Sequence, residues 1–323
     1  MFGKITVRNI PEDVLVALEA MAKRNDRSLE AEARFALRSH VQPVMQAEIR
    51  NTRMAEVGIR LTSALDQLNR VRAARMRKPS HIAQAIGESG ASAVEDWFIG
   101  MDEPTFVQLE RVADYIGCSQ AWLQHGDGQM FQVDSTHLSE NPGEAVAWLL
   151  DLDREEHQRV RTLHLIREDD ESGSLLIVKQ YEDWHCTAWR TPIHVSDHIG
   201  AGGERALACL SVTLQLLYGY YTSSHLRGSG LVIKSYQLSI DAAKAIRSGN
   251  AHALSALDDG VERPWWEDIW DKSQYETHTG YWSGWTKLCQ RIANAVAFWN
   301  ELAQQRDEIA RKQHPLLRGE TSH

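Results

Sequence analysis

The chain has 323 residues, of which 43% are hydrophobic and 24% are charged. These fractions are close to those of ordinary globular proteins, so they exclude a collagen-like, mucin-like or wholly disordered chain. The length predicts about two domains, or three if some of them are small.

The charge of the chain is unevenly distributed. The formal net charge is −9, which taken alone argues against a general nucleic-acid binder. Residues 1–80, however, contain 15 Lys and Arg against 9 Asp and Glu, a net charge of +6, whereas residues 81–323 contain 20 against 35, a net charge of −15. The split indicates that the N-terminal part meets a polyanion, although a chance run of solvated charge would give the same count.

The cysteine pattern and the apolar stretches bear on the cellular compartment. The cysteines are far apart and form no C-x-x-C pair, which favours reduced thiols: Cys118, Cys186, Cys209 and Cys289. The start of the chain lacks a secretory signal, and the most apolar stretch, residues 207–221, is too short to span a bilayer. We therefore expect a cytoplasmic protein without membrane association, bound metal or cofactor.

The first 42 residues predict one strand and two helices. Ile5 and Val7 alternate with polar neighbours over residues 4–10, which is the pattern of a strand with one buried face. Pro11 favours a helix start, and Ser28 favours the N-cap of a second helix. So short a segment cannot bury its own apolar faces, so it needs a partner copy.

This segment resembles the ribbon-helix-helix family of the Arc and MetJ type, and within it the antitoxin-like subgroup. The resemblance rests on the strand V-x-I-R-N-L/I-P followed by R-S-x-E-A-E-x-R, which here are Val7, Arg8, Asn9, Ile10 and Pro11, then Arg27, Ser28, Glu30, Ala31, Glu32 and Arg34. It implies a dimer of β-α-α chains over residues 1–42, whose paired strands enter the major groove of double-stranded DNA.

The resemblance also implies which side chains meet DNA. The ribbon residues at the DNA are Lys4, Thr6, Arg8 and Asn9. Arg8 is the main candidate for reading a base, because its planar fork can bond guanine O6 and N7 together. Ser28 and the start of the second helix would hold a phosphate. The alternative is that Lys4 and Arg8 only solvate an edge strand.

Residues 43–59 predict a helical or partly ordered linker between Pro43 and Gly58, and residues 60–131 predict about five short helices. The second region resembles the helix-turn-helix domain of phage-type repressors, the Xre family. The resemblance rests on S-x-I-A-x-x-I-G from Ser80, a helix that ends W-F-I-G, and L-x-x-V-A-x-x-I-G-C-S-x-x-W-L-x-x-G from Leu109. It implies an all-α fold whose helix at residues 92–99 faces the major groove.

Two features of this region leave its DNA role open. The turn at residues 88–91 is about one residue longer than the common pattern, and the presumed reading helix carries Glu95 and Asp96, which phosphates repel. The candidate DNA contacts are Arg75, Arg77, Lys78, Ser80 and Ser92. The alternatives are an interaction module that kept the fold and a solvated basic face.

Residues 132–323 predict an α+β domain of no family that we recognise. We expect one or two helices over residues 144–166, strands over 175–178, 186–190 and 231–238, and helices over 204–221, 241–257 and 285–312. Tryptophans cluster in this domain, and four of them are candidates for a ligand box: Trp265, Trp266, Trp270 and Trp282. A core or a subunit interface would need the same residues.

The sequence thus predicts a multidomain chain with a ribbon-helix-helix domain, an all-α helix-turn-helix domain and an α+β sensor or assembly domain. We interpret it as a transcriptional repressor that binds DNA as a homodimer or higher homo-oligomer and takes a possible small-molecule effector. The alternative is an antitoxin that neutralises a toxin partner and controls its own promoter. No nucleophile–base pair or metal-ligand spacing in residues 132–323 indicates an enzyme.

Overall fold

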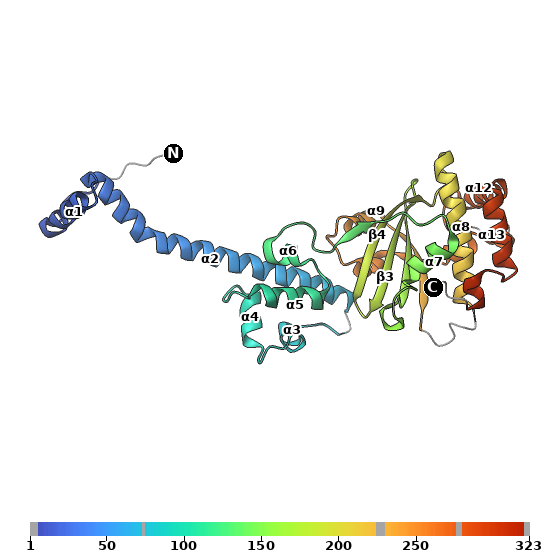
Figure 1. Ribbon diagram of the computed structural model, residues 1–323, viewed down its shortest axis with the longest axis horizontal. Coiled ribbons are helices and arrows are strands. Elements are labelled where there is room, and N and C mark those ends of the chain that lie inside the picture. The colour runs from blue at the N-terminus through green and yellow to red at the C-terminus, as the bar shows by residue number, and fades with distance from the viewer. Residues whose placement is uncertain (1–5, 73–74, 224–229, 276–279, 320–323) are drawn as a thin grey trace. The chain divides into compact units, whose positions relative to one another are not determined.

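The computed structural model describes residues 6–72, 75–223, 230–275 and 280–319, with the backbone alone for residues 41–51 and 201 (Figure 1). The chain divides into two compact units, one formed by residues 1–59 with 96–103 and the other by residues 60–95 with 104–323. No helix in the described part of the chain is long and apolar enough to cross a membrane.

The first unit contains the two helices that the sequence predicts. Helix α1 spans Glu12–Arg24, and helix α2 begins at Leu29 and continues to Val71. Pro43 and Gly58, which we expected at the ends of a linker, both lie inside α2. A Cβ on Gly58 would lie 2.9 Å from the carbonyl oxygens of Trp97 and Phe98, so glycine permits a close backbone approach there.

The described part of the strand predicted over residues 4–10, which is residues 6–10, does not form a strand in the single chain. Residues 6–11 are neither helix nor strand, and Lys4 and Ile5 lie outside the described residues. A strand exists only through hydrogen bonds to a neighbour, and a ribbon of this type takes its neighbour from a second copy.

The second unit begins with a helical region. It contains the C-terminal part of α2, α3 (Pro79–Ile86), α4 (Ser92–Phe98), α5 (Phe106–Ile116) and α6 (Gln120–His125). Local signals explain these bounds: Pro79 is the first residue of α3, and Thr105 and Gln108 form a capping box on α5. Gly87, Gly117 and Gly126 end α3, α5 and α6 in the left-handed conformation.

A six-stranded mixed sheet follows, in the order β1-β4-β3-β2-β5-β6. The strands are β1 (Val133–Ser135), β2 (Thr162–Glu168), β3 (Ser174–Glu182), β4 (His185–His194), β5 (Val232–Leu238) and β6 (Val261–Glu262). The pairs β2–β3, β3–β4 and β5–β6 are antiparallel, whereas β1–β4 and β2–β5 are parallel. The predicted hairpin and the strand at residues 231–238 are therefore confirmed.

One prediction in this domain is wrong, because residues 162–166 form the strand β2 and not a helix. Helix α7 (Pro142–Leu150) ends at the residue before Asp151, which adopts the left-handed conformation. Six of the seven residues of β2 are buried, since both faces of the sheet are covered. A strand buried on both faces loses the period-two pattern that distinguishes it from a helix.

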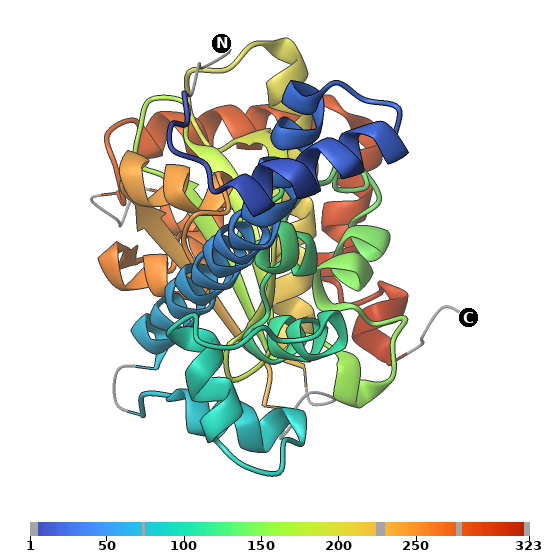
Figure 2. The ribbon, with the colours of Figure 1, turned by 90° about the vertical axis from the view of Figure 1, so that its left-hand side faces the viewer.

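Helices cover both faces of the sheet (Figure 2). One face packs against α7 and α8 (Ala201–Tyr221), and α12 (Trp285–Phe298) and α13 (Asn300–Ala310) pack in turn against α8. The other face packs against α9 (Ile240–Arg247) and α10 (Ala253–Ala256). The helix predicted over residues 285–312 is divided at Trp299, whose backbone is extended. Short elements complete the unit: η1 (Glu156–Gln158), η3 (Leu257–Asp259), α11 (Trp265–Asp268), η4 (Lys272–Gln274) and η5 (Pro315–Arg318).

The tip of the β3–β4 hairpin joins the sheet to the helical region. Trp184 is buried, and its indole Nε1 donates a 2.8 Å hydrogen bond to the carbonyl oxygen of Tyr115 in α5. The guanidinium groups of Arg72 and Arg77 lie 4.7 and 5.5 Å from the centre of its ring, and Arg72 also pairs with Asp183 at 2.6 Å. Trp184 is therefore an anchor between two parts of the second unit.

We expect Trp184→Ala to lower the free energy of unfolding by about 3–5 kcal/mol, the usual cost of truncating a buried aromatic side chain. Urea unfolding followed by circular dichroism measures it. Asp183→Ala is the matched control, because its carboxylate is 69% exposed and an exposed ion pair contributes less than about 1 kcal/mol. Equal losses in the two variants would contradict the anchoring role.

Candidate nucleic-acid interface

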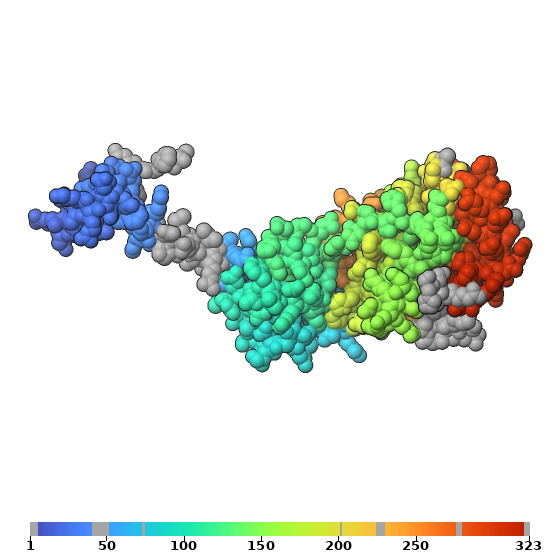
Figure 3. Space-filling model, viewed as in Figure 1, coloured from blue at the N-terminus to red at the C-terminus, as the bar shows by residue number. Residues whose placement is uncertain are grey.

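The segment from residue 6 to residue 40 leaves its apolar side chains uncovered. Only Ala22 and Glu32 are buried within it. Val7 is 62% exposed and Phe35 is 48% exposed. The other exposed apolar side chains of this segment, which is dark blue in Figure 3, are Ile10, Val14, Val16, Met21, Leu29 and Leu37. The apolar stripes that the sequence predicts are therefore present but lack a core within one chain.

The turn between α1 and α2 is held by a buried carboxylate. Glu32 accepts a 3.0 Å hydrogen bond from the Asn25 amide and a 3.3 Å bond from the Arg27 guanidinium. The same guanidinium lies 4.4 Å from the centre of the Phe35 ring. These partners compensate the buried charge of Glu32. They also link the residues of the turn to the first turn of α2.

Ser28 is placed as the sequence predicts, before the first turn of α2. Its hydroxyl oxygen accepts a 3.1 Å hydrogen bond from the backbone N–H of Ala31, which is the bond of an N-cap. The nearby carboxylate of Glu30 is exposed and lies 3.9 Å from Arg34. Ser28 thus caps the helix, and its hydroxyl proton remains available to an acceptor such as a phosphate oxygen.

The described ribbon residues face solvent. Thr6, Arg8 and Asn9 are all exposed, and Lys4 lies outside the described residues. Asn9 has a positive φ of 59°, a conformation that asparagine tolerates better than most residues. Ile10 follows, and then Pro11 precedes α1 as its N-cap residue. The chain therefore turns just after Arg8 and leaves the Arg8 guanidinium exposed beside the helix start.

The candidate residues of the helical region do not all share this exposure. Arg75, Lys78 and Ser92 are exposed, whereas Ser80 and Arg77 are half-buried. The backbone of Arg77 is bonded twice by the Asn69 side chain, at 2.6 and 2.9 Å. The Arg77 guanidinium lies near the Trp184 ring and takes part in the hairpin contact. The exposed candidates for a DNA contact are therefore Arg75, Lys78 and Ser92.

The tryptophan cluster lies in the core of the second unit. Trp265 and Trp266 are 0% and 1% exposed. Trp265 donates a 3.3 Å hydrogen bond to the Tyr236 carbonyl oxygen, and Trp282 lies 4.2 Å below the Arg167 guanidinium. Trp270 is half-buried against the same core. Trp265 and Trp266 thus offer no accessible face and match the core alternative. Trp270 and Trp282 are half-buried, so for them the ligand box stays a prediction.

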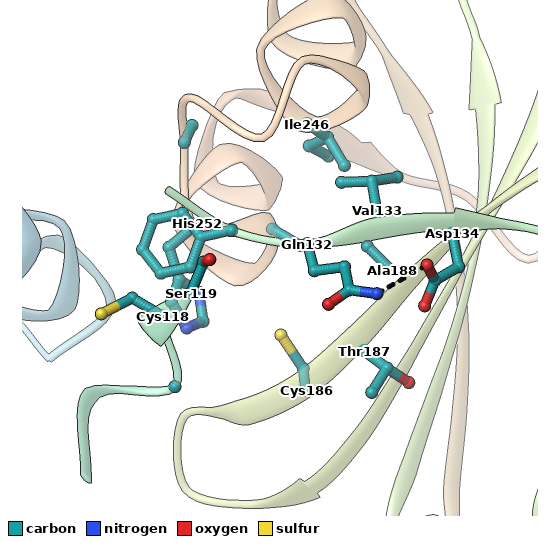
Figure 4. Close-up of a pocket in the computed structure, with 14 residues that line it drawn as sticks. Cys118, Ser119, Gln132, Val133, Asp134, Cys186, Thr187, Ala188, Ile246 and His252 are labelled. Carbon is teal, nitrogen blue, oxygen red and sulfur yellow. Dashed lines mark hydrogen bonds between the residues drawn. The ribbon is translucent and has the colours of Figure 1, made fainter. Parts of the chain in front are cut away.

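A cavity of about 280 Å³ lies where the helical region meets the sheet (Figure 4). Its lining comes from residues 117–119, 131–134, 186–188 and 251–253 together with Ile246. No sequence motif links these segments, so sequence reasoning missed this cavity. They come together only because the β3–β4 hairpin and the segment after α6 pack against α9 and α10.

The comparisons with known proteins bear on the N-terminal segment alone. Residues 4–41 match the family model described as antitoxin FitA-like, ribbon-helix-helix. No curated protein and no solved structure matches the chain. The match confirms the ribbon-helix-helix resemblance, whereas the helix-turn-helix resemblance of residues 60–131 stays a prediction. Residues 4–41 are thus similar to the ribbon-helix-helix domain of FitA-like antitoxins.

Proposed function

We propose that this protein is a sequence-specific transcriptional repressor that binds double-stranded DNA as a homodimer. The observation that carries the proposal is the uncovered apolar surface of residues 6–40 on a segment that matches a ribbon-helix-helix model. Two copies would cover this surface on each other and pair their segments at residues 4–10. The paired segments would then enter the major groove, which is wide enough for a two-stranded ribbon.

The charge distribution supports DNA as the partner. Residues 1–80 carry a net charge of +6, and Arg8 is exposed on the segment that would form the ribbon. Phosphate contacts from such a segment would supply affinity, and base contacts from Arg8 would supply specificity. Occupation of an operator that overlaps a promoter would exclude RNA polymerase and repress transcription.

The second unit supplies the remaining roles in this proposal. Arg75 and Lys78 precede α3 and are exposed, so they are available to flanking phosphates. The α+β region, which is covered by helices on both faces, would sense a ligand or mediate assembly. Its net negative charge, part of the −15 of residues 81–323, disfavours contact with the DNA backbone.

A second candidate function is an antitoxin that neutralises a protein toxin and represses its own promoter. The observation that favours it is the description of the matching model, which is that of an antitoxin domain. In this case part of the chain after residue 41 would bind the toxin. The role of the second unit would then be to bind the toxin on its surface and not to sense a ligand.

The role of Arg8 can be measured by footprinting on operators selected from genomic DNA at a fixed salt concentration. We expect Arg8→Ala to weaken specific binding by about 1–3 kcal/mol and to relax the preference at one base pair. Arg8→Lys is the matched control: it keeps the charge but loses the bidentate fork, so it should retain non-specific affinity and lose the base preference. Unchanged footprints in both variants would rule out the ribbon as the reader.

The proposed dimer predicts opposite effects at two neighbouring positions. We expect Val7→Asp to convert the dimer to monomer in sedimentation equilibrium, because the apolar face of the ribbon would bury an unpaired carboxylate. Thr6→Asp, on the other face, should leave the dimer intact and weaken DNA binding through repulsion of phosphate. Dimers of unchanged stability with Val7→Asp would contradict this mode of pairing.

Co-expression separates the two candidate functions. If the protein is an antitoxin, a toxic protein encoded next to its gene should arrest growth alone and be neutralised by the full-length chain. The Arg8→Ala variant should still neutralise it, because that variant is altered only at the ribbon. Neutralisation by the wild-type chain would favour the antitoxin role, and its absence together with specific operator binding would favour the repressor.

A further inference from the structure

The cavity between the helical region and the sheet has walls from both parts of the second unit. Gly117, Cys118 and Ser119 come from the turn between α5 and α6, and Cys186, Thr187 and Ala188 come from β4. At about 280 Å³ it lies near the lower end of the volumes of small-molecule sites. Figure 4 shows Cys186 of β4, Gln132 just before β1 and Asp134 of β1 around the same space.

Most of the wall is apolar and uncharged. Phe131, Val133 and Ile246 supply the larger apolar side chains, and three alanines fill the gaps between them: Ala188, Ala251 and Ala253. Burial raises the pKa of the Cys118 thiol to about 12, and it raises the pKa of the Cys186 thiol equally. Both thiols are therefore protonated at neutral pH and contribute a soft, neutral surface.

His252 adds no charge to the cavity. Burial lowers the pKa of its imidazole to about 4, so the ring is neutral at pH 7. The ring Nδ1 accepts a 3.3 Å hydrogen bond from the backbone N–H of Leu254. Its ring also lies edge-to-face against Phe131, with 5.0 Å between the ring centres.

Asp134 is the one carboxylate on this lining, and the lining contains no Lys or Arg. The Gln132 amide donates a 2.8 Å hydrogen bond to one of its oxygens. Within the described part of the chain, no Lys or Arg forms an ion pair with it. The nearby Arg190 guanidinium donates a 3.3 Å hydrogen bond to the carbonyl oxygen of Val133 and is not part of the lining. The charged group that a ligand in this otherwise neutral and apolar cavity meets is therefore the Asp134 carboxylate, which attracts a cation.

We propose that this cavity binds a small organic amine, with its ammonium group against Asp134 and its compact apolar group against Phe131, Val133 and Ile246. Such a ligand contacts the α5–α6 turn and β4 at once, so it strengthens the contact between the helical region and the sheet. Its use as the effector of a repressor rests on the proposed function above. The binding itself does not depend on that function.

Three probes that share a phenyl ring but differ in the charge of their polar group test the proposal on the full-length protein. Calorimetric titration compares 2-phenylethylamine, phenylacetate and 2-phenylethanol. We expect the amine to bind at least about tenfold more tightly than the acid, with the alcohol between them, because Asp134 attracts the first and repels the second.

Two variants locate the site. Asp134→Asn should abolish the preference for the amine, and Asp127→Asn, an exposed carboxylate outside the cavity, should leave it unchanged. Cys186→Met should weaken binding of all three probes, since the longer side chain fills the space, and circular dichroism verifies that the variant is folded. Equal affinity for amine and acid, or a preference that survives Asp134→Asn, would overturn the proposal.

Operator affinity, measured with and without the amine, separates this proposal from the function proposed above. If the protein binds the amine through Asp134 but recognises no operator, the proposed site is supported and the proposed repressor function is refuted. Operator binding without any selective amine binding would sustain the repressor and refute the site.

Discussion

The contact of Trp184 with the helical region determines how the second unit is organised. The indole lies at the tip of the β3–β4 hairpin, bonds the end of α5 through Tyr115, and lies next to the guanidinium groups of Arg72 and Arg77. Each of these interactions is modest alone, but together they surround a buried aromatic side chain, which dominates the energy of such a contact. The consequence is that the tip of the β3–β4 hairpin contacts the helical region, and that β4 also forms a wall of the cavity.

The segment from residue 6 to residue 40 differs from the second unit, because its exposed apolar side chains lack a core within one chain. Its turn is held by Glu32, which has two hydrogen-bond partners. In the dimer that we propose, a second copy would cover the apolar side chains, so the amount of folded segment would depend on protein concentration. Under the proposed function, repression would then rise steeply with the amount of protein in the cell.

Two buried charged side chains on the central strands of the sheet form ion pairs. Lys179 lies 2.8 Å from Asp151 and 3.6 Å from the centre of the Trp148 ring, and burial lowers the pKa of its ammonium group. Glu168 pairs with Arg247 at 2.6 Å. Lys179 and Glu168 are on strands covered by helices on both faces, where an unpaired charge would be costly. Asp134 differs from them because it lines a cavity and forms no ion pair with the described residues.

The sequence was enough to predict those helix ends and caps that depend on a few neighbouring residues. Pro79 and Gly87 bound α3, Ser28 caps α2, and the pattern from Val7 to Arg34 identified a domain that the family match confirmed. Tertiary structure alone decided that residues 162–166 are a strand, that Trp265 and Trp266 fill a core, and that Arg77 faces an indole. Caps and periodicity depend on a few residues of one chain segment. Three other features depend on residues that are distant in sequence and become adjacent only after folding: burial on two faces, the partner of an aromatic ring and the lining of a cavity.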